Sequence, residues 1–146
     1  MRNSKFAGLR NRFRLAAVLS VLALSVPTAV SAQTETVDRD FLNSFYTFLQ
    51  GQDDFSYQLA TGWMGDETNV WLAKGVCLDF DRGLSPAEGY DLFVSAARTQ
   101  MQGLTQQEYD RAAYAVDLYG GALMNLGSAY YCPQYQPQVE AALRSR

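Results

Sequence analysis

Apolar side chains recur at helical spacing along most of the chain beyond residue 37. The first stripe runs from Phe41 to Leu49 and places apolar residues one helical turn apart. Asp38 stands where a helix cap is expected, and Gly51 follows the stripe, where glycine easily adopts a left-handed helix end. No segment alternates polar and apolar residues for long enough to predict a strand. The pattern therefore predicts an all-helical fold, a small bundle of four to five helices.

A second helix is predicted to start near Asp66 or Thr68 and to end at about Arg82, because Gly83 then supplies a stop. We expect its apolar residues to face the core. Four of them form one face and two widen it: Val70, Ala73, Cys77 and Phe80, with Trp71 and Leu78.

Two later helix starts carry the clearest local signals. The run from Ser85 to Glu88 is a capping box with proline at the first helical position, and Gly103 ends the helix that it opens. The run from Thr105 to Glu108 repeats the capping box, and Leu104 and Tyr109 flank it as a hydrophobic staple. The stripe that follows predicts a long fourth helix through Ala112, Val116, Tyr119, Leu123, Leu126 and Tyr130.

Two features interrupt or end this fourth helix. Gly120 and Gly121 fall inside the stripe, and because glycine weakens a helix, we expect a kink, a break or a close helix contact there. Pro133 ends the helix directly after Cys132. One short amphipathic turn is expected between Val139 and Leu143.

The stretch from Gly51 to Asp66 has no clear periodicity and is predicted to be a loop that packs on the core through its aromatic residues. Loops of this length often carry function or hide a short helix. The candidate contact surface is therefore Phe55, Tyr57, Trp63 and Met64. The alternative is that Tyr57 and Trp63 simply fill the core.

The first residues have the layout of a secretory signal peptide. A basic start leads into an apolar stretch from Leu15 to Val26, which is shorter than the roughly 20 residues that a membrane-spanning helix needs. Small residues at Val30 and Ala32 predict cleavage after Ala32. The predicted organisation is a signal peptide at 1–32, a polar lead-in at 33–37, a helical domain at 38–136 and a tail at 137–146. We expect the mature protein in a secreted, periplasmic or cell-envelope space.

Removal of this signal makes the chain strongly acidic. All 15 acidic residues but only seven of the 12 basic residues lie beyond Ala32, so the mature net charge is −8. Such a chain repels nucleic-acid phosphates and anionic membrane surfaces, so we expect no nucleic-acid partner. We also expect no stable membrane span after cleavage. Possible partners are proteins or components of the envelope.

Cys77 and Cys132 are the only cysteines, and both lie in the mature part. An even number of cysteines in an exported chain predicts a disulfide. The bridge would join the second and fourth helices across the hairpin between them. The alternatives are two free thiols or a metal pair, although a zinc site needs three or four ligands.

The chain contains no histidine, which excludes Ser-His-Asp and Cys-His catalysis and histidine-ligated metals. Carboxylates are plentiful, but they are not arranged for catalysis. Asp79 and Asp81 lie two positions apart on a predicted helix, so their side chains diverge, and Glu88 belongs to a helix cap. We therefore predict a non-enzymatic binding or interaction protein with no cofactor and no metal. The alternative is a small carboxylate-dependent hydrolase that acts on envelope polysaccharide.

Several short motifs occur in a characteristic order: Gly75-Val76-Cys77, Asp81-Arg82-Gly83, Ser85-Pro86-Ala87-Glu88, Gly103-Leu104-Thr105 and Tyr131-Cys132-Pro133. In this order the chain resembles the domain of unknown function 732 family, small exported bacterial proteins best known from actinobacteria. The resemblance covers roughly residues 38–136. It implies an all-helical domain with a Cys77–Cys132 disulfide and implies no activity. The chain departs from the family in a longer last helix, Thr105 to Cys132, and in the long segment after Gly51.

Overall fold

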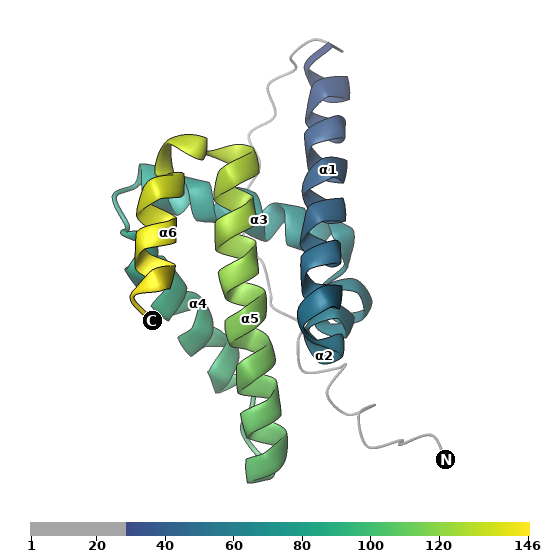
Figure 1. The fold of residues 1–146 in the computed structure, drawn as a ribbon, viewed down its shortest axis with the longest axis vertical. Coiled ribbons are helices and arrows are strands. Elements are labelled where there is room, and N and C mark those ends of the chain that lie inside the picture. The colour runs from purple at the N-terminus through teal and green to yellow at the C-terminus, as the bar shows by residue number, and fades with distance from the viewer. Residues whose placement is uncertain (1–28) are drawn as a thin grey trace.

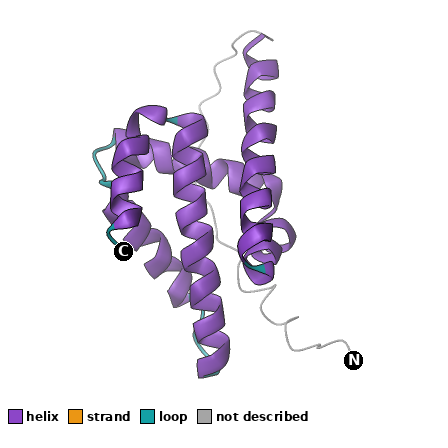
Figure 2. Ribbon diagram, viewed as in Figure 1, coloured by secondary structure: helices purple, strands orange, loops and turns teal. Residues whose placement is uncertain are grey.

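The computed structural model describes residues 29–146, which are helical almost throughout (Figures 1 and 2). The elements are α1 Ala29–Gln52, α2 Asp54–Gln58, the π-helix Leu59–Met64, α3 Gly65–Asp81, α4 Pro86–Thr99, α5 Gln106–Tyr131, the 3₁₀ turn Pro133–Tyr135 and α6 Gln136–Arg144. Residues 29–146 contain no strand, so the predicted all-helical class is confirmed. The predicted signal peptide lies outside the described residues, except that α1 begins at Ala29.

The central element is α5, which contacts α1, α3, α4 and α6. In Figure 1 it stands between α1 on one side and α6 on the other, and α3 crosses behind it. Its predicted stripe supplies Val116, Tyr119 and Leu123 to the buried core, where they meet Phe41 and Phe45 of α1. Burying each large apolar side chain stabilises the fold by about 1.5–3 kcal/mol, so the stripe on α5 organises the whole domain.

Both predicted capping boxes are present. The Glu88 N–H donates to Ser85 Oγ (3.3 Å), and the Ser85 N–H donates back to Glu88 Oε2 (2.9 Å). Hydrogen bonds from the Ser85 hydroxyl and N–H stabilise the ionised carboxylate and lower the pKa of Glu88. Thr105 and Glu108 make the same exchange at the start of α5, so both helix starts are confirmed.

The predicted stops after α3 and α4 are also present. Gly83 and Gly103 have φ values of +95° and +87°, a region that favours glycine. A third glycine with positive φ, Gly65 at +76°, was not singled out from the sequence and marks the change from the π-helix to α3.

The predicted loop between Gly51 and Asp66 is wrong, because this stretch is almost entirely helical. Gly51 lies inside α1 and does not form a left-handed cap. Asp53 starts a new helix instead: its Oδ2 accepts from the Ser56 N–H (2.7 Å) and from the Ser56 hydroxyl (2.8 Å). The glycine and aspartate content of the stretch from Gly51 to Asp66 suggests a loop. A side-chain cap and tertiary contacts nevertheless hold this stretch in helical turns.

The two ends of the domain are more helical than predicted. The polar lead-in at 33–37 belongs to α1, so Asp38 does not cap a helix. Asp38 instead pairs with Lys74 of α3 (2.8 Å) and accepts from the Tyr131 hydroxyl of α5 (2.9 Å). At the other end, most of the tail at 137–146 lies in α6, whose Val139 is fully buried. The packed helical unit therefore extends beyond the predicted limits of 38–136.

The predicted core face of α3 is too wide. Ala73, Cys77 and Phe80 are buried as expected, whereas Trp71 and Leu78 are exposed. The cause lies in the close approach of two helices: a Cβ on Gly127 of α5 would lie 3.1 Å from the Ala73 Cβ. A contact between such small residues buries only a narrow strip of α3.

The glycine pair in α5 produces a close helix contact, the third of the predicted outcomes. The helix is continuous through Gly120 and Gly121. A Cβ on Gly120 would lie only 2.8 Å from the Phe93 ring of α4, whereas one on Gly121 would lie 3.9 Å from Leu143. Gly120 therefore allows α4 to pack against α5.

A hydrogen-bonded network of polar side chains crosses the core. The buried Asn69 amide donates to the Ala60 carbonyl (2.9 Å) and to the Tyr46 hydroxyl (2.9 Å), and it accepts from the Tyr119 hydroxyl (2.6 Å). Tyr46 in turn donates to Asp66 Oδ1 (2.5 Å). Burial raises the pKa of Tyr119, and burial with the Asp66 acceptor raises the pKa of Tyr46. The network ties α1, the π-helix, α3 and α5 together.

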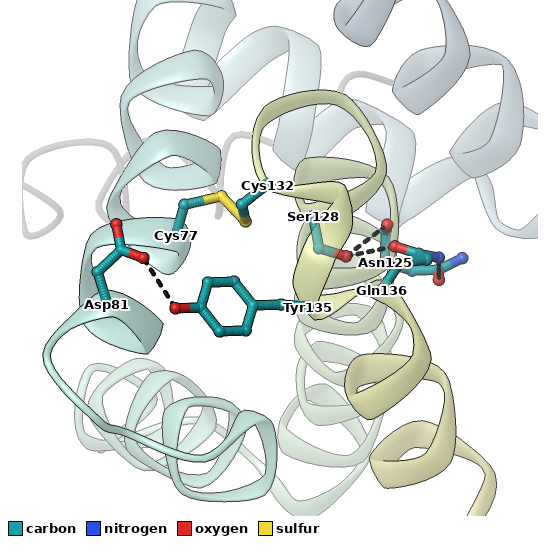
Figure 3. The surroundings of a disulfide bond; sticks show 7 residues. All are labelled: Cys77, Asp81, Asn125, Ser128, Cys132, Tyr135 and Gln136. Carbon is teal, nitrogen blue, oxygen red and sulfur yellow. Dashed lines mark hydrogen bonds between the residues drawn. A yellow bond between two sulfur atoms is a disulfide. The ribbon is translucent and has the colours of Figure 1, made fainter.

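Cys77 of α3 and Cys132, directly after α5, form a buried disulfide with a Cα–Cα distance of 5.8 Å (Figure 3). The predicted bridge is confirmed, and free thiols and a metal pair are excluded. The Tyr135 ring packs edge-on against Phe80 (5.3 Å between centroids), and its hydroxyl donates to Asp81 (2.8 Å). The turn Pro133–Tyr135 that follows the disulfide is therefore also held to α3 by the contacts of Tyr135.

Candidate functional site

Two of the four residues of the predicted contact surface lie together on one face. The Asp53 cap sets the start of α2 and places Phe55 in its first turn, and the π-helix then carries Trp63 back toward it. The two rings meet edge to face with centroids 5.7 Å apart and an interplanar angle of 82°. π-Helical turns are rare and are often found at functional sites.

These rings border a hollow of about 320 Å³, which we call the aromatic hollow. Its lining comes from α2, the π-helix, the turn before α5 and α5 itself: Phe55, Gln58, Trp63, Leu104, Glu108, Arg111 and Ala112. This volume is at the lower end of the range for small-molecule sites in proteins.

Arg111 gives the aromatic hollow its positive group. Its guanidinium lies over the Phe55 ring, 5.3 Å from the centroid. The other six basic residues of the described chain all form ion pairs with carboxylates. Within residues 29–146, Arg111 alone among the basic residues forms no ion pair.

Glu108 lies one turn before Arg111 and lines the same hollow. One of its oxygens, Oε2, accepts from both the Thr105 N–H (3.0 Å) and the Thr105 hydroxyl (2.8 Å). This oxygen therefore belongs to the cap at the start of α5. The positive end of the aromatic hollow lies one turn farther along the helix, at Arg111.

The other two predicted contact residues do not line the aromatic hollow. Tyr57 is half-buried and packs edge-on against Tyr46 of α1, with 6.2 Å between ring centroids. Met64 is also half-buried and packs against the main core. The alternative that these aromatic residues fill the core holds for Tyr57, whereas Trp63 both packs on the core and lines the hollow.

The sequence reasoning missed the contribution of α5 to this site. Leu104 was identified only as part of a helix staple, and Arg111 was not singled out. The available signal was compositional, because Arg111 is one of only seven basic residues beyond residue 32, where all 15 acidic residues lie.

A second concave surface, which we call the apolar groove, was missed completely. It lies between α3 and α4 above α5 and has a volume of about 210 Å³. Its lining includes Trp71, Gly75 and Asp79 on α3, Gly89 and Leu92 on α4, and Leu123 and Met124 on α5. Trp71 could not be recognised as part of a surface because its position also fits the predicted core stripe.

No pair of carboxylates lines any of four surface hollows formed by residues 29–146. Each of four surface hollows is lined by a single carboxylate: Asp79, Asp117, Glu108 or Glu140. Among residues 29–146, no group of three acidic or cysteine side chains is arranged to hold a metal ion. In that same range, none of the helices combines the length and the apolar character that crossing a membrane requires.

Comparisons of the chain with protein-family models, with curated proteins and with solved structures gave no match.

Proposed function

We propose that this chain is an exported, non-enzymatic binding protein of the cell envelope or exterior, and that the aromatic hollow is its ligand site. The observation that carries this proposal is the meeting of Phe55, Trp63 and Arg111 at one hollow of about 320 Å³. Apolar walls with one well-placed polar group are the usual design of a small-molecule site.

The walls indicate the body of the ligand. Phe55 and Trp63 supply aromatic surface to the hollow, and Leu104 and Ala112 add aliphatic surface. We therefore expect a ligand with an apolar body the size of one or two fused rings.

Arg111 indicates the head group. A guanidinium binds a carboxylate with two parallel hydrogen bonds, and Arg111 has no competing ion pair within the described chain. A hydrogen bond to a charged group contributes about 1.5 kcal/mol or more, and about 1.4 kcal/mol corresponds to tenfold in affinity. The proposed ligand class is thus a small aromatic or aliphatic carboxylate.

The competing function is a carboxylate-dependent hydrolase acting on envelope polysaccharide. That chemistry uses two carboxyl groups that flank one bond, roughly 5–10 Å apart. Glu108 is the sole carboxylate of the aromatic hollow and is engaged in the cap of α5. This arrangement favours binding over hydrolysis.

The ligand class is tested with two matched probes, 1-naphthoate and its uncharged amide, added to the mature protein. The indole N–H signal of Trp63, assigned with a Trp63→Phe variant, reports binding in NMR spectra. We expect about tenfold tighter binding of 1-naphthoate, and we expect Arg111→Gln to remove this preference. Arg82→Gln, which changes an exposed base on α3, is the matched control. Equal binding of both probes, or a preference that survives Arg111→Gln, would contradict the proposal.

We further propose that the chain is a member of the domain of unknown function 732 family and is exported by cleavage after Ala32. The confirmed disulfide between Cys77 and Cys132 supports an oxidising compartment. The mass of the protein recovered outside the cytoplasm tests the cleavage. A product that retains residues 1–32 would rule out the signal peptide.

A further inference from the structure

Three large apolar side chains of α3 and α4 are exposed. Trp71 is 58% exposed, Leu78 is 54% exposed and Leu92 is 62% exposed. Two of them, Trp71 and Leu92, border the apolar groove from opposite helices. Clustered exposed apolar residues on a soluble domain often mark an interaction surface.

Two glycines keep the groove open. Gly75 lies on α3 and Gly89 on α4, and both line the groove. A Cβ at Gly75 would meet nothing within 4 Å, and one at Gly89 would meet only the Phe80 ring at 3.7 Å. Since mid-helix glycine costs about 1 kcal/mol relative to alanine, neither position is explained by close packing or by helix stability.

Acidic residues lie in the groove or one helical turn from its lining. Asp79 lines it, Glu67 lies one turn before Trp71, and Glu88 lies one turn before Leu92. Asp79 is offset only by Arg82, in an exposed pair with a separation of 3.8 Å.

The end of α3 also carries acids in an unfavourable place. Asp79 and Asp81 lie in its last turn, which has no basic residue, although the helix dipole favours cations there. Asp79 therefore makes this end of the groove acidic, whereas Asp81 accepts from the Tyr135 hydroxyl (2.8 Å).

We propose that the apolar groove docks a cationic, amphipathic segment of a partner protein. An apolar side chain of the partner enters between Trp71 and Leu92, above Leu123 and Met124. Lysine or arginine residues one turn away pair with Glu67, Asp79 and Glu88. The small groove gives room for one or two side chains, so we expect affinity in the micromolar range.

A second copy of this chain is a poor occupant of the groove, because two copies would each bring a mature net charge of −8 and the same acidic rim. An anionic lipid surface is disfavoured for the same reason. The proposal stands apart from the aromatic hollow, which is formed by other residues.

The test uses two short designed helical peptides that share the same pattern of leucines. One peptide has lysine at the polar positions and the other has glutamate. Fluorescence of Trp71 in a Trp63→Phe variant of the mature protein reports binding. We expect a blue shift and micromolar binding of the lysine peptide, weaker binding at high salt, and no binding of the glutamate peptide. Equal binding of both peptides would overturn the charge argument.

Variants separate docking in the groove from general attraction to an acidic protein. A leucine at position 75 grows into open space, so Gly75→Leu should fill the groove without disturbing the core and should weaken binding about tenfold or more. Tyr114→Ala removes an equally exposed ring from α5 outside the groove and is the matched control. Unchanged binding in Gly75→Leu would overturn the proposal, as would a dimer in sedimentation that Gly75→Leu abolishes.

Discussion

Two junctions on α5 are held together by different physics. At the polar junction, Asn69, Tyr119, Tyr46 and the Ala60 carbonyl join helices by hydrogen bonds in the core. At the covalent junction, Cys77 and Cys132 join α3 to the end of α5 by a disulfide. The first acts in the folded state and depends on every partner being present. The second acts mainly by restricting the unfolded chain, so it tolerates changes in its surroundings.

Removing the covalent junction should have the largest effect. The two cysteines are 55 positions apart, and closing a loop of this size stabilises a fold by about 4 kcal/mol in the chain-entropy model. We expect Cys77→Ser with Cys132→Ser to lower the free energy of unfolding by about that amount, measured by denaturant titration. The free energy of unfolding should also fall more steeply with denaturant concentration, because the unfolded chain becomes more expanded. An unchanged unfolding midpoint would contradict this prediction.

Breaking the polar junction should lower the free energy of unfolding somewhat less. It should leave the slope of this free energy against denaturant concentration unchanged. Asn69→Leu removes the partner of the Tyr119 hydroxyl and one partner of the Ala60 carbonyl, both in the core. The Tyr119 hydroxyl is then left without a partner, at a cost of about 1–3 kcal/mol, and the Ala60 carbonyl and the Tyr46 hydroxyl each lose one hydrogen bond, so we expect a loss of about 3 kcal/mol. Asn43→Leu, at an exposed position of α1, is the control. If Asn69→Leu lost less free energy of unfolding than Asn43→Leu, the network would not stabilise the junction.

The two junctions also differ in how far the sequence predicts them. The disulfide is predicted from the number of cysteines together with a predicted export signal, and the capped starts at Ser85 and Thr105 are predicted from local residue patterns. The network around Asn69 has no local signature, because its hydrogen-bonded partners lie up to 50 positions apart. The same limit explains the errors between Gly51 and Asp66, where helical structure depends on tertiary contacts.

The residues of the candidate sites also divide into those that the sequence identifies and those that it does not. Phe55 and Trp63 were identified because aromatic residues in an irregular stretch stand out. Arg111 and Trp71 were missed because their roles depend on what lies opposite them in the fold, namely the Phe55 ring and Leu92. Periodicity places a residue on a helix face but does not show which neighbouring helix covers that face.

Disturbing the packing of α4 on α5 should have a smaller effect than breaking either junction. Gly120→Ala places a methyl group 2.8 Å from the Phe93 ring and forces it to move. Overpacking of this kind costs about 1–3 kcal/mol, and we expect about 2 kcal/mol in the same titration. Gly121→Ala is a matched control, since its Cβ lies 3.9 Å from Leu143, and it should be neutral or slightly stabilising. Equal effects of both substitutions would show that the contact with α4 is not limiting.

Alkaline pH should weaken the polar junction and spare the covalent one. Burial raises the pKa of Tyr119 in the folded protein, whereas an unfolded tyrosine ionises near about pH 10. Above that pH the unfolded state loses a proton that the folded state keeps. Stability is therefore fully present below about pH 10 and falls by about 1.4 kcal/mol per pH unit above it for this residue.

A Tyr119→Phe variant should be less stable at neutral pH but should lose stability less steeply above pH 10. Tyr46 and Tyr131 also have raised pKa values, caused first by burial and then by carboxylate acceptors, so a smaller slope should remain. Tyr114→Phe, on the exposed face of α5, serves as the control and should keep the parent slope. Denaturant titrations at several pH values measure these slopes. The same slope in Tyr119→Phe as in the parent would mean that the buried hydroxyl does not govern the alkaline response of the polar junction.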